Sequence, residues 1–233
     1  MIYLLGANGN IGINISKYLY EKEVKFVGIT RVPRPNNTCY TEFLEIISKT
    51  NNSTVINAAI LSAFDLKLFI NSVPKCTKII HISSVAVYGN TNLVNKVSPI
   101  NNYGYLKVKE EEFFLHNFTA FIIRLSNIYG GIPETSGVLK LYNTGKLKFI
   151  EVDEENRELI RDFVNIDLLL EQIYDNLYFS KNNIVNVSSG VGIKSSDFFY
   201  SINLDISNIK RQLYDTKNVI KSSIIDPNYK KYN

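Results

Sequence analysis

The sequence predicts an α/β fold built on a doubly wound parallel sheet, and three observations carry this prediction. Short apolar runs rich in β-branched residues alternate with amphipathic stretches over the first half of the chain. These runs are apolar at successive positions, as expected of strands that are covered on both faces. A glycine-rich turn at residues 6–12 joins the first apolar run to the first amphipathic stretch, which is how a parallel β-α-β arrangement begins.

The alternation places each expected element. We expect strands at residues 2–5, 25–30, 54–58, 78–82, 120–124 and 184–187, and helices at residues 11–20, 41–48, 66–73 and 103–116. In the first helix, Ile11, Ile15, Tyr18 and Leu19 fall on one face. Residues 130–137 are rich in glycine and proline, and residues 152–161 are strongly charged. We expect loops there, of the kind with which α/β proteins build substrate sites.

Composition narrows the class of protein. A chain of 233 residues with 45% hydrophobic and 12% aromatic residues fits one domain, or one large domain with a small second lobe. The net charge of +4 is spread along the chain, which argues against nucleic-acid binding and is compatible with a small anionic substrate. Cys39 and Cys76 have no metal-ligand or disulfide pattern. Without a signal peptide or an apolar run of about 20 residues, we expect a cytoplasmic protein with no membrane contact.

The turn at residues 6–12 has the pattern Gly-x-x-Gly-x-x-Gly. Gly6 permits a tight turn, Gly9 lets the backbone approach a diphosphate, and Gly12 allows close packing of helix on strand. The helix that follows offers unpaired N–H groups and the positive end of its dipole to phosphates. A glycine turn without a ligand is the alternative, and the strand–turn–helix context argues against it. The turn therefore predicts a Rossmann dinucleotide-binding fold, with cofactor contacts from Gly6, Asn8, Gly9, Asn10, Ile11 and Gly12.

The end of the second strand bears on the choice of dinucleotide. Thr30 lies eighteen positions after Gly12, where an acidic residue would bind the ribose 2′-hydroxyl of NAD. Arg31 follows, and Arg34 is close by. A guanidinium can bind a 2′-phosphate through two hydrogen bonds. Thr30 and Arg31 therefore favour NADP, with NAD as the other possibility. A solvated surface arginine is the alternative reading of Arg31.

A catalytic group is predicted from a strand end and a helix. Ser84 ends a strand in a cluster of small and hydroxyl residues, and nineteen positions later Tyr103 and Lys107 form a Tyr-x-x-x-Lys pattern on an expected helix. The spacing i,i+4 puts both side chains on one face. With fifteen tyrosines in the chain, chance matches are easy, and Tyr105 with Lys109 is one of them. The asparagines before Tyr103 and the glycine after it favour Tyr103.

This pairing suits proton transfer. A tyrosine has a pKa of about 10, and a neighbouring ammonium together with an oxidised nicotinamide would lower it, which makes Tyr103 a general acid/base. Lys107 would also bind the nicotinamide ribose, and Ser84 the substrate oxygen. Hydride would move between a substrate carbon and the nicotinamide. His81, Ser83 and His116 are interpreted as packing or solvated residues.

These residues together resemble the extended short-chain dehydrogenase/reductases that act on nucleotide sugars, over almost the whole chain. Beyond the glycine turn and Tyr-x-x-x-Lys, the similar segments are residues 57–59 (Asn-Ala-Ala), 83–89 (Ser-Ser-x-x-x-Tyr-Gly), 124–130 (Arg-x-x-Asn-x-Tyr-Gly), 161–168 (Arg-Asp-Phe-Val-Asn-Ile-Asp-Leu) and 186–190 (Asn-x-x-x-Gly). The glycine turn and residues 55–59 are also similar to dTDP-4-dehydrorhamnose reductases.

The resemblance implies further roles. Ala58 and Ala59 would line the cofactor, Ser126 would approach the nicotinamide, and Asn127 and Arg161 would bind the diphosphate of a sugar nucleotide. It also implies a dinucleotide-binding part at residues 1–130. Residues 131–233 would be mainly a substrate lobe, interleaved with the last Rossmann elements.

The implied function is an NAD(P)-dependent nucleotide-sugar reductase or epimerase, in the synthesis of a bacterial surface polysaccharide and with a homodimer formed through the helix of Tyr103. Ala86 stands where some epimerases of the family have a cysteine, and Ser84-Val85-Ala86 replaces the Thr-Asp-Glu set of the dehydratases. Dehydration is therefore disfavoured. Two alternatives stay open: a reductase of a non-nucleotide carbonyl compound, and a non-catalytic NAD(P)-binding sensor.

Overall fold

The fold is described from a computed structural model, which covers residues 1–32, 37–90, 96–213 and 230–231. Its centre is a sheet in the order β13-β10-β6-β5-β4-β1-β2-β3. Seven strands of this sheet are parallel, and β13 (Lys230–Lys231) pairs antiparallel with β10. The parallel strands are β1 (Ile2–Leu5), β2 (Phe26–Thr30), β3 (Thr38–Cys39), β4 (Thr54–Asn57), β5 (Lys78–Ser84), β6 (Thr119–Leu125) and β10 (Asn183–Val187). The order steps outward from β1 in both directions, which is the doubly wound arrangement.

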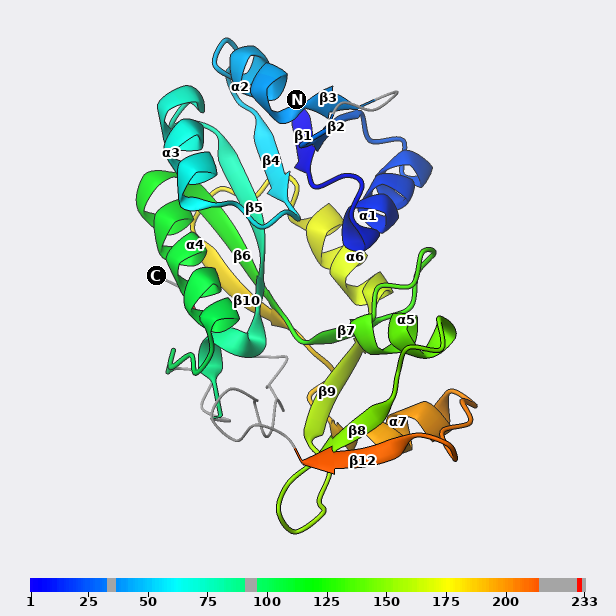
Figure 1. The fold of residues 1–233 in the computed structure, drawn as a ribbon. Helices are drawn as coiled ribbons and strands as arrows, with labels where there is room; N and C mark the ends of the chain where they lie inside the picture. Colours follow the sequence, from blue (N-terminus) through cyan, green and yellow to red (C-terminus); the bar gives the residue numbers. More distant parts are fainter. Residues whose placement is uncertain (33–36, 91–95, 214–229, 232–233) are drawn as a thin grey trace.

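Helices cover both faces of the sheet (Figure 1). On one face lie α1 (Asn10–Glu21) and α6 (Ile166–Asp175), and on the other lie α2 (Tyr40–Ile47), α3 (Ala63–Ser72) and α4 (Asn102–Asn117). Each layer closes over its own apolar cluster, the first including Ile15 and Leu19 of α1 and the second including Phe69 of α3 and Phe114 of α4. The strands are apolar on both faces because each face is buried by a layer of helices.

A smaller part of the chain lies beyond the carboxyl ends of the strands (Figure 1). It contains one three-stranded sheet, one two-stranded sheet and two short helices. Its elements are β7 (Asn127–Tyr129), α5 (Gly137–Asn143), β8 (Phe149–Val152), β9 (Ile160–Asn165), β11 (Gly192–Lys194), α7 (Ser195–Ser201) and β12 (Lys210–Leu213). A separate aromatic cluster, with Phe163 stacked on Phe198, packs this part together.

The predicted α/β class and doubly wound sheet are confirmed. The expected strands and helices of the first half all form, with ends that differ by at most three residues. The second half is more regular than expected, because the charged stretch at residues 152–161 is a turn between β8 and β9 and not a long loop. Within the described residues, no helix is both long enough and apolar enough to cross a membrane.

Candidate active site

The glycine turn has the geometry that its sequence predicts. Gly6 has a φ of +81°, a conformation that side chains disfavour. A Cβ on Gly12 would lie 2.1 Å from the carbonyl oxygen of Gly6, so helix and strand could not pack at this distance with any other residue. The N–H of Gly9 donates to the same carbonyl at 2.9 Å. The turn thus directs the unpaired N–H groups at the start of α1 outward, where an anion can bind.

A cavity of about 490 Å³ opens beside this turn, at the carboxyl ends of β1, β2 and β4. It brings together seven of the residues predicted to bind the cofactor, namely Gly6, Asn8, Gly9, Thr30, Arg31, Ala58 and Ala59. A larger cavity of about 620 Å³ lies at the opposite edge of the sheet, next to Met1 and Lys78, and contains no predicted site residue. The carboxyl edge is where open parallel sheets bind their ligands.

The other predicted cofactor residues on α1 lie next to this cavity without lining it. The side-chain amide of Asn10 donates to the backbone oxygen of Glu134 at 3.1 Å, so this side chain contacts the loop that precedes α5. Ile11 packs against the core cluster under α1. These residues can therefore reach a phosphate only through their backbone N–H groups.

Arg31 has a partner that the sequence analysis did not consider. Its guanidinium donates to the carboxylate of Asp65 at 3.1 Å and to the backbone oxygen of Ile60 at 2.9 Å. Asp65 also closes a capping box with Ser62 at the start of α3. The sequence has no acidic residue near position 30, but the fold brings the carboxylate of Asp65 to Arg31 from a later helix. Arg34 lies outside the described residues.

Close packing brings the start of α4 against the end of β5. The strand ends at Ser84, whose hydroxyl accepts the N–H of Ala86 at 3.2 Å and begins the short helix η1 (Val85–Tyr88). A Cβ on Gly104 would lie 2.6 Å from the backbone oxygen of Ala86. Glycine at this position therefore lets the first turn of α4, which carries Tyr103, approach η1 and the strand end.

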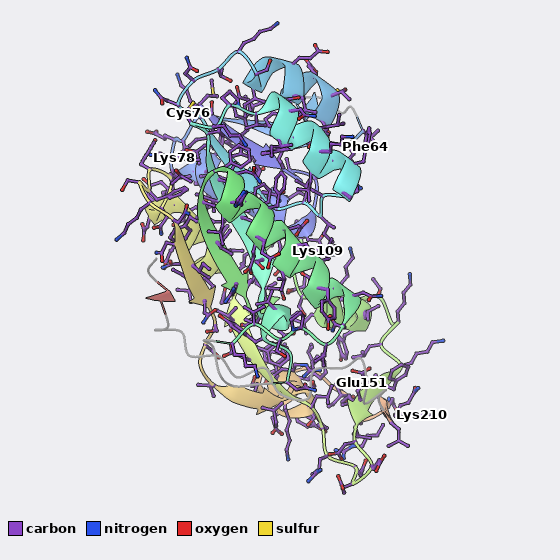
Figure 2. The ribbon with its side chains drawn as sticks, turned by 90° about the vertical axis from the view of Figure 1, so that its left-hand side faces the viewer. Phe64, Cys76, Lys78, Lys109, Glu151 and Lys210 are labelled. Carbon is purple, nitrogen blue, oxygen red and sulfur yellow. The ribbon has the colours of Figure 1, made fainter. Side chains whose placement is uncertain are left out.

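Tyr103 and Lys107 have different environments on this helix. The side chain of Tyr103 is 46% exposed, whereas Lys107 is 4% exposed. The ammonium of Lys107 lies 6.0 Å from the centre of the Tyr103 ring. The hydroxyl of Tyr103 makes no hydrogen bond within the part of the chain that the structure describes, so it can accept a ligand partner. The competing pair lies outward, since Tyr105 is 54% exposed and Lys109 is on the exposed face of α4 (Figure 2).

Lys107 is held by two acceptors. Its ammonium donates to Glu110 Oε2 at 2.8 Å and to the backbone oxygen of Ile82 at 3.1 Å. Glu110 is fully buried. We expected Lys107 to contact Tyr103 and the cofactor, and the carboxylate of Glu110 is a further partner. The charge of a buried lysine needs such a counterion, because burial without one strongly disfavours an ammonium.

A second buried ion pair fixes α4 against the sheet. The guanidinium of Arg124 on β6 donates to both carboxylate oxygens of Glu111 and to the hydroxyl of Tyr88. Tyr88 in turn donates to Asn186 on β10 at 2.8 Å. The Ser83 hydroxyl also donates to Glu111, so Ser83 is more than the packing residue we expected. This network joins α4 to β5, β6, η1 and β10.

His81 is buried beside the first ion pair, in agreement with its interpretation as a strand residue. It is 0% exposed, and its Nδ1 lies 3.1 Å from the side-chain amide of Asn57. Burial, and then the positive charge of Lys107, hold the pKa of His81 well below its ordinary value. The imidazole is therefore neutral at pH 7. His116 is an exposed residue in the last turn of α4.

Ser126 and Asn127, which were predicted to contact the nicotinamide and the diphosphate, both bind one aspartate. Asp162 is fully buried, and its carboxylate accepts hydrogen bonds from the Ser126 hydroxyl, the Ser189 N–H and hydroxyl, and the Gly190 N–H. Its backbone oxygen accepts the side-chain amide of Asn127 at 3.2 Å. The hydroxyl of Ser126 therefore points to Asp162, and its predicted approach to the nicotinamide stays a prediction.

Arg161 adjoins this cluster on β9, half-buried, and is paired with Ile193 of β11 in the sheet. Its guanidinium donates to the backbone oxygen of Ile160 at 3.4 Å. The fold thus brings Ser126, Asn127 and Arg161 near one another through the pairing of β7 with β9. Their roles toward a substrate stay predictions.

Four residues that matter for this geometry were missed, namely Asp65, Glu110, Glu111 and Asp162. One signal was present for two of them. Glu110 and Glu111 follow Lys107 at spacings i,i+3 and i,i+4, which places both near the lysine's face of the helix. Asp162 lies in the Arg-Asp-Phe segment that carries part of the resemblance, although no role was expected for it. Asp65 meets Arg31 across a long stretch of sequence, which no local pattern reveals.

Comparison with solved structures supports the fold. The Bordetella bronchiseptica enzyme WbmH, solved with NAD+, superposes with a TM-score of 0.73 at 17% identity, over 97% of this chain and 89% of that one. UDP-glucose 4-epimerase from Thermotoga maritima, solved with UDP-glucose, gives 0.73 at 19% identity, over 97% and 90%. dTDP-glucose 4,6-dehydratase from Bacillus anthracis, solved with NAD, gives 0.71 at 16% identity, over 94% and 86%.

These structures share the fold expected from the resemblance to extended short-chain dehydrogenase/reductases, and that expectation is confirmed. No family model and no curated protein sequence matches the chain.

Proposed function

We propose that the protein is an NAD(P)-dependent enzyme that reduces or epimerises a nucleotide sugar. The observation that carries the proposal is the juxtaposition of two features at one edge of the sheet. One is a glycine turn beside a cavity of about 490 Å³. The other is an open tyrosine hydroxyl one helical turn from a buried, ion-paired lysine.

The residues of the cavity fit a dinucleotide. Gly6 and Gly9 keep the turn itself free of side chains, and Gly12 lets the start of α1 pack closely against it, as the binding of a diphosphate by backbone N–H groups requires. Ala58 and Ala59, which follow β4, have small side chains that leave room in the cavity for a flat ring. Solved neighbours with this fold hold NAD, as in WbmH. The bound nicotinamide would supply the acceptor or donor of a hydride.

The roles of the chain's own groups follow from their surroundings. Tyr103 donates or accepts the proton at the reacting oxygen of the substrate, because its hydroxyl is open and lies on the helix that abuts Ser84. Ser84 donates a hydrogen bond to the same oxygen. Lys107 binds the nicotinamide ribose with the N–H that Glu110 and Ile82 leave free, and its charge favours the phenolate form of the tyrosine.

A nucleotide sugar is the proposed substrate class. Neighbours with the same fold were solved with UDP-glucose and with UDP-glucuronic acid. In this chain, Asn127 and Arg161 would bind the diphosphate, a task that suits a guanidinium. Ser126 would line the nicotinamide end of the site. Dehydration is disfavoured, because Val85 and Ala86 offer no second acid/base. The reaction is therefore a simple reduction, an oxidation or a 4-epimerisation.

We further propose that the enzyme prefers NADP over NAD, because Thr30 and Arg31 lie where the 2′-phosphate would bind. Residues 1–130 form the dinucleotide-binding part, and residues 131–233 form the substrate lobe with the last strands of the main sheet. Two copies pair through α4. The proposal also places the enzyme in the cytoplasm, in surface-polysaccharide synthesis.

The substitution Tyr103→Phe tests the proposal, with Tyr105→Phe as its matched control on the same helix. Reduction of a panel of 4-keto sugar nucleotides is followed by NADPH absorbance, and NADPH binding by fluorescence. We expect Y103F to lower kcat by about 10²–10⁴-fold, the usual worth of a general acid/base, with nearly unchanged NADPH binding. Y105F should match the wild type. Full activity of Y103F would refute the assignment.

The same assay separates the alternatives. A non-catalytic sensor would bind NADPH, reduce none of the panel and interconvert no nucleotide-sugar epimers, whereas an epimerase would do the last without net loss of NADPH. A reductase of a non-nucleotide carbonyl would be active on simple ketones, and Arg161→Met would then leave its KM unchanged. With a nucleotide sugar as substrate, R161M should raise KM, because the diphosphate loses a charged donor.

A further inference from the structure

Glu110 has contacts that the proposed chemistry leaves unexplained. It is a fully buried carboxylate on α4, and both of its oxygens are occupied. Oε2 accepts the ammonium of Lys107 at 2.8 Å, and Oε1 accepts the backbone N–H of Leu61 at 3.0 Å. Leu61 lies at the end of the segment after β4, and it lines the same cavity as Ala58 and Ala59. One side chain therefore joins the lysine to the wall of the dinucleotide cavity.

His81 lies between the same carboxylate and the same wall. Its Nε2 is 3.5 Å from Glu110 Oε2 but makes no hydrogen bond within the described residues, and its Nδ1 lies 3.1 Å from the side-chain amide nitrogen of Asn57. An amide nitrogen can only donate, so Nδ1 accepts and the imidazole proton is on Nε2. Asn57 Oδ1 accepts the N–H of Ala59 at 3.1 Å. Asn57, His81 and Glu110 are all 0% exposed.

We propose that Glu110 is a positioning residue, which fixes the ammonium of Lys107 and ties its place to the cavity wall at Ala59 and Leu61. The inference rests on the proposed function. Lysine has four rotatable side-chain bonds, and two acceptors, Glu110 and the Ile82 carbonyl, hold its end. The third N–H of the ammonium is left for the nicotinamide ribose.

The burial of this pair supports a role in geometry. Apolar residues of similar size often stabilise a protein as well as a buried ion pair does, so burial of both charges is weak evidence for a role in stability. Small displacements of catalytic groups can cost about a hundred-fold in rate. Glu110 binds the Lys107 ammonium through one oxygen and the Leu61 N–H of the cavity wall through the other, which limits displacement of the lysine.

The substitution Glu110→Gln tests this role. Glutamine keeps the volume but has one acceptor oxygen, so it can satisfy Leu61 or Lys107, not both. We expect E110Q to lower kcat about a hundred-fold, with little change in KM for the sugar nucleotide. Glu112→Gln is the matched control, since Glu112 is exposed on the same helix, and it should leave both constants unchanged.

A double-mutant cycle separates positioning from a merely structural effect. In a Lys107→Met background, E110Q should lower kcat no further, because the lysine that Glu110 positions is gone. The same non-additivity is expected in the dissociation constant for NADPH. If E110Q fails to fold, Glu110→Asp keeps the charge on a shorter side chain and should show the same non-additivity.

Two outcomes would overturn the inference, and they can be told apart. Equal losses from E110Q in the wild-type and K107M backgrounds would show that Glu110 acts through the fold alone, while the proposed function stands. A wild-type protein that neither binds NADPH nor turns over any carbonyl substrate would refute both the proposed function and this role.

Discussion

Glu110 and Glu111 are neighbours on one helix, and the comparison between them shows how one residue type serves two purposes. Both carboxylates are buried. Glu111 accepts three hydrogen bonds from Arg124, and this pair connects α4 to the central strands. Glu110 accepts the ammonium of Lys107 and the N–H of Leu61, and this pair connects α4 to the rim of the cofactor cavity.

The difference lies in the partners. Arginine presents a planar fork that matches a carboxylate at two points and stays charged in all conditions. Lysine presents a single mobile ammonium, which suits a group that must also contact a ligand. We infer that the Glu111–Arg124 pair maintains the fold and that the Glu110–Lys107 pair serves the site. Substitutions in each pair can test whether one pair serves stability and the other serves the site.

Glu111→Ala should cost about 3–5 kcal/mol of unfolding free energy, because it leaves the guanidinium of Arg124 buried without a counterion. Urea denaturation followed by circular dichroism measures the change. Glu112→Ala, at an exposed position on the same helix, should change stability by about 0.5 kcal/mol or less. A cost below about 1 kcal/mol for E111A would contradict the scaffold role of this pair.

His81 should make stability depend on pH in a defined direction. Its pKa is lowered in the folded protein, by burial first and by Lys107 second, so below pH about 6.5 the unfolded chain binds a proton that the folded chain does not. The unfolding free energy should therefore fall as the pH falls below about 6.5, by up to about 1.4 kcal/mol per pH unit.

Urea denaturation at pH 7 and pH 5.5 tests this dependence. Relative to His81→Gln, the wild type should lose about 1 kcal/mol more between the two values. Stability that rises on acidification would mean that Glu110 pairs with a charged imidazole, and our description of the Glu110 side of the comparison would be wrong.

The pair of Arg31 with Asp65 provides the exposed counterpart of these two buried pairs. The Arg31 side chain is 69% exposed, and exposed pairs contribute about 0–1 kcal/mol. Asp65→Asn should therefore cost about 1 kcal/mol or less, since asparagine keeps an oxygen that can accept the Ser62 N–H of the capping box. It should also free the guanidinium for a 2′-phosphate, so the affinity ratio of NADP over NAD should rise about two- to fivefold, the worth of such a pair.

Calorimetric titration with both dinucleotides measures this ratio. Asp197→Asn, which removes a carboxylate from the first turn of α7, is the control and should leave the ratio unchanged. A lower ratio in D65N would indicate that Arg31 does not contact the 2′ position.

Most of the main sheet was predictable, because its strands and the helices between them differ in apolar periodicity. The glycine turn was predictable as well, since Gly6 is favoured by its positive φ and Gly12 by its close approach to the nearby carbonyl of Gly6. The smaller sheets were not: β7, β9 and β11 are six residues or shorter, and only contact with one another makes them strands.

The helical spacing predicted that Tyr103 and Lys107 lie on one face of α4, but Tyr105 and Lys109 have the same spacing. The fold separates the two pairs, since it buries Lys107 and exposes Lys109. The catalytic roles of Tyr103 and Lys107 stay predictions. The helical spacing indicated Glu110 as a counterion of Lys107, whereas contacts between residues far apart in the sequence were not predictable. Asp65 meets Arg31 across 34 positions and Leu61 meets Glu110 across 49, and such contacts arise from the layering of the fold.

A structure of the protein with NADP+ bound tests the central claim most directly. The account predicts the diphosphate on the turn at residues 6–12, the adenosine in the cavity beside Arg31, and a hydroxyl of the nicotinamide ribose within hydrogen-bonding distance of Lys107 Nζ. A dinucleotide bound elsewhere, or one whose nicotinamide lies away from Tyr103, would contradict it.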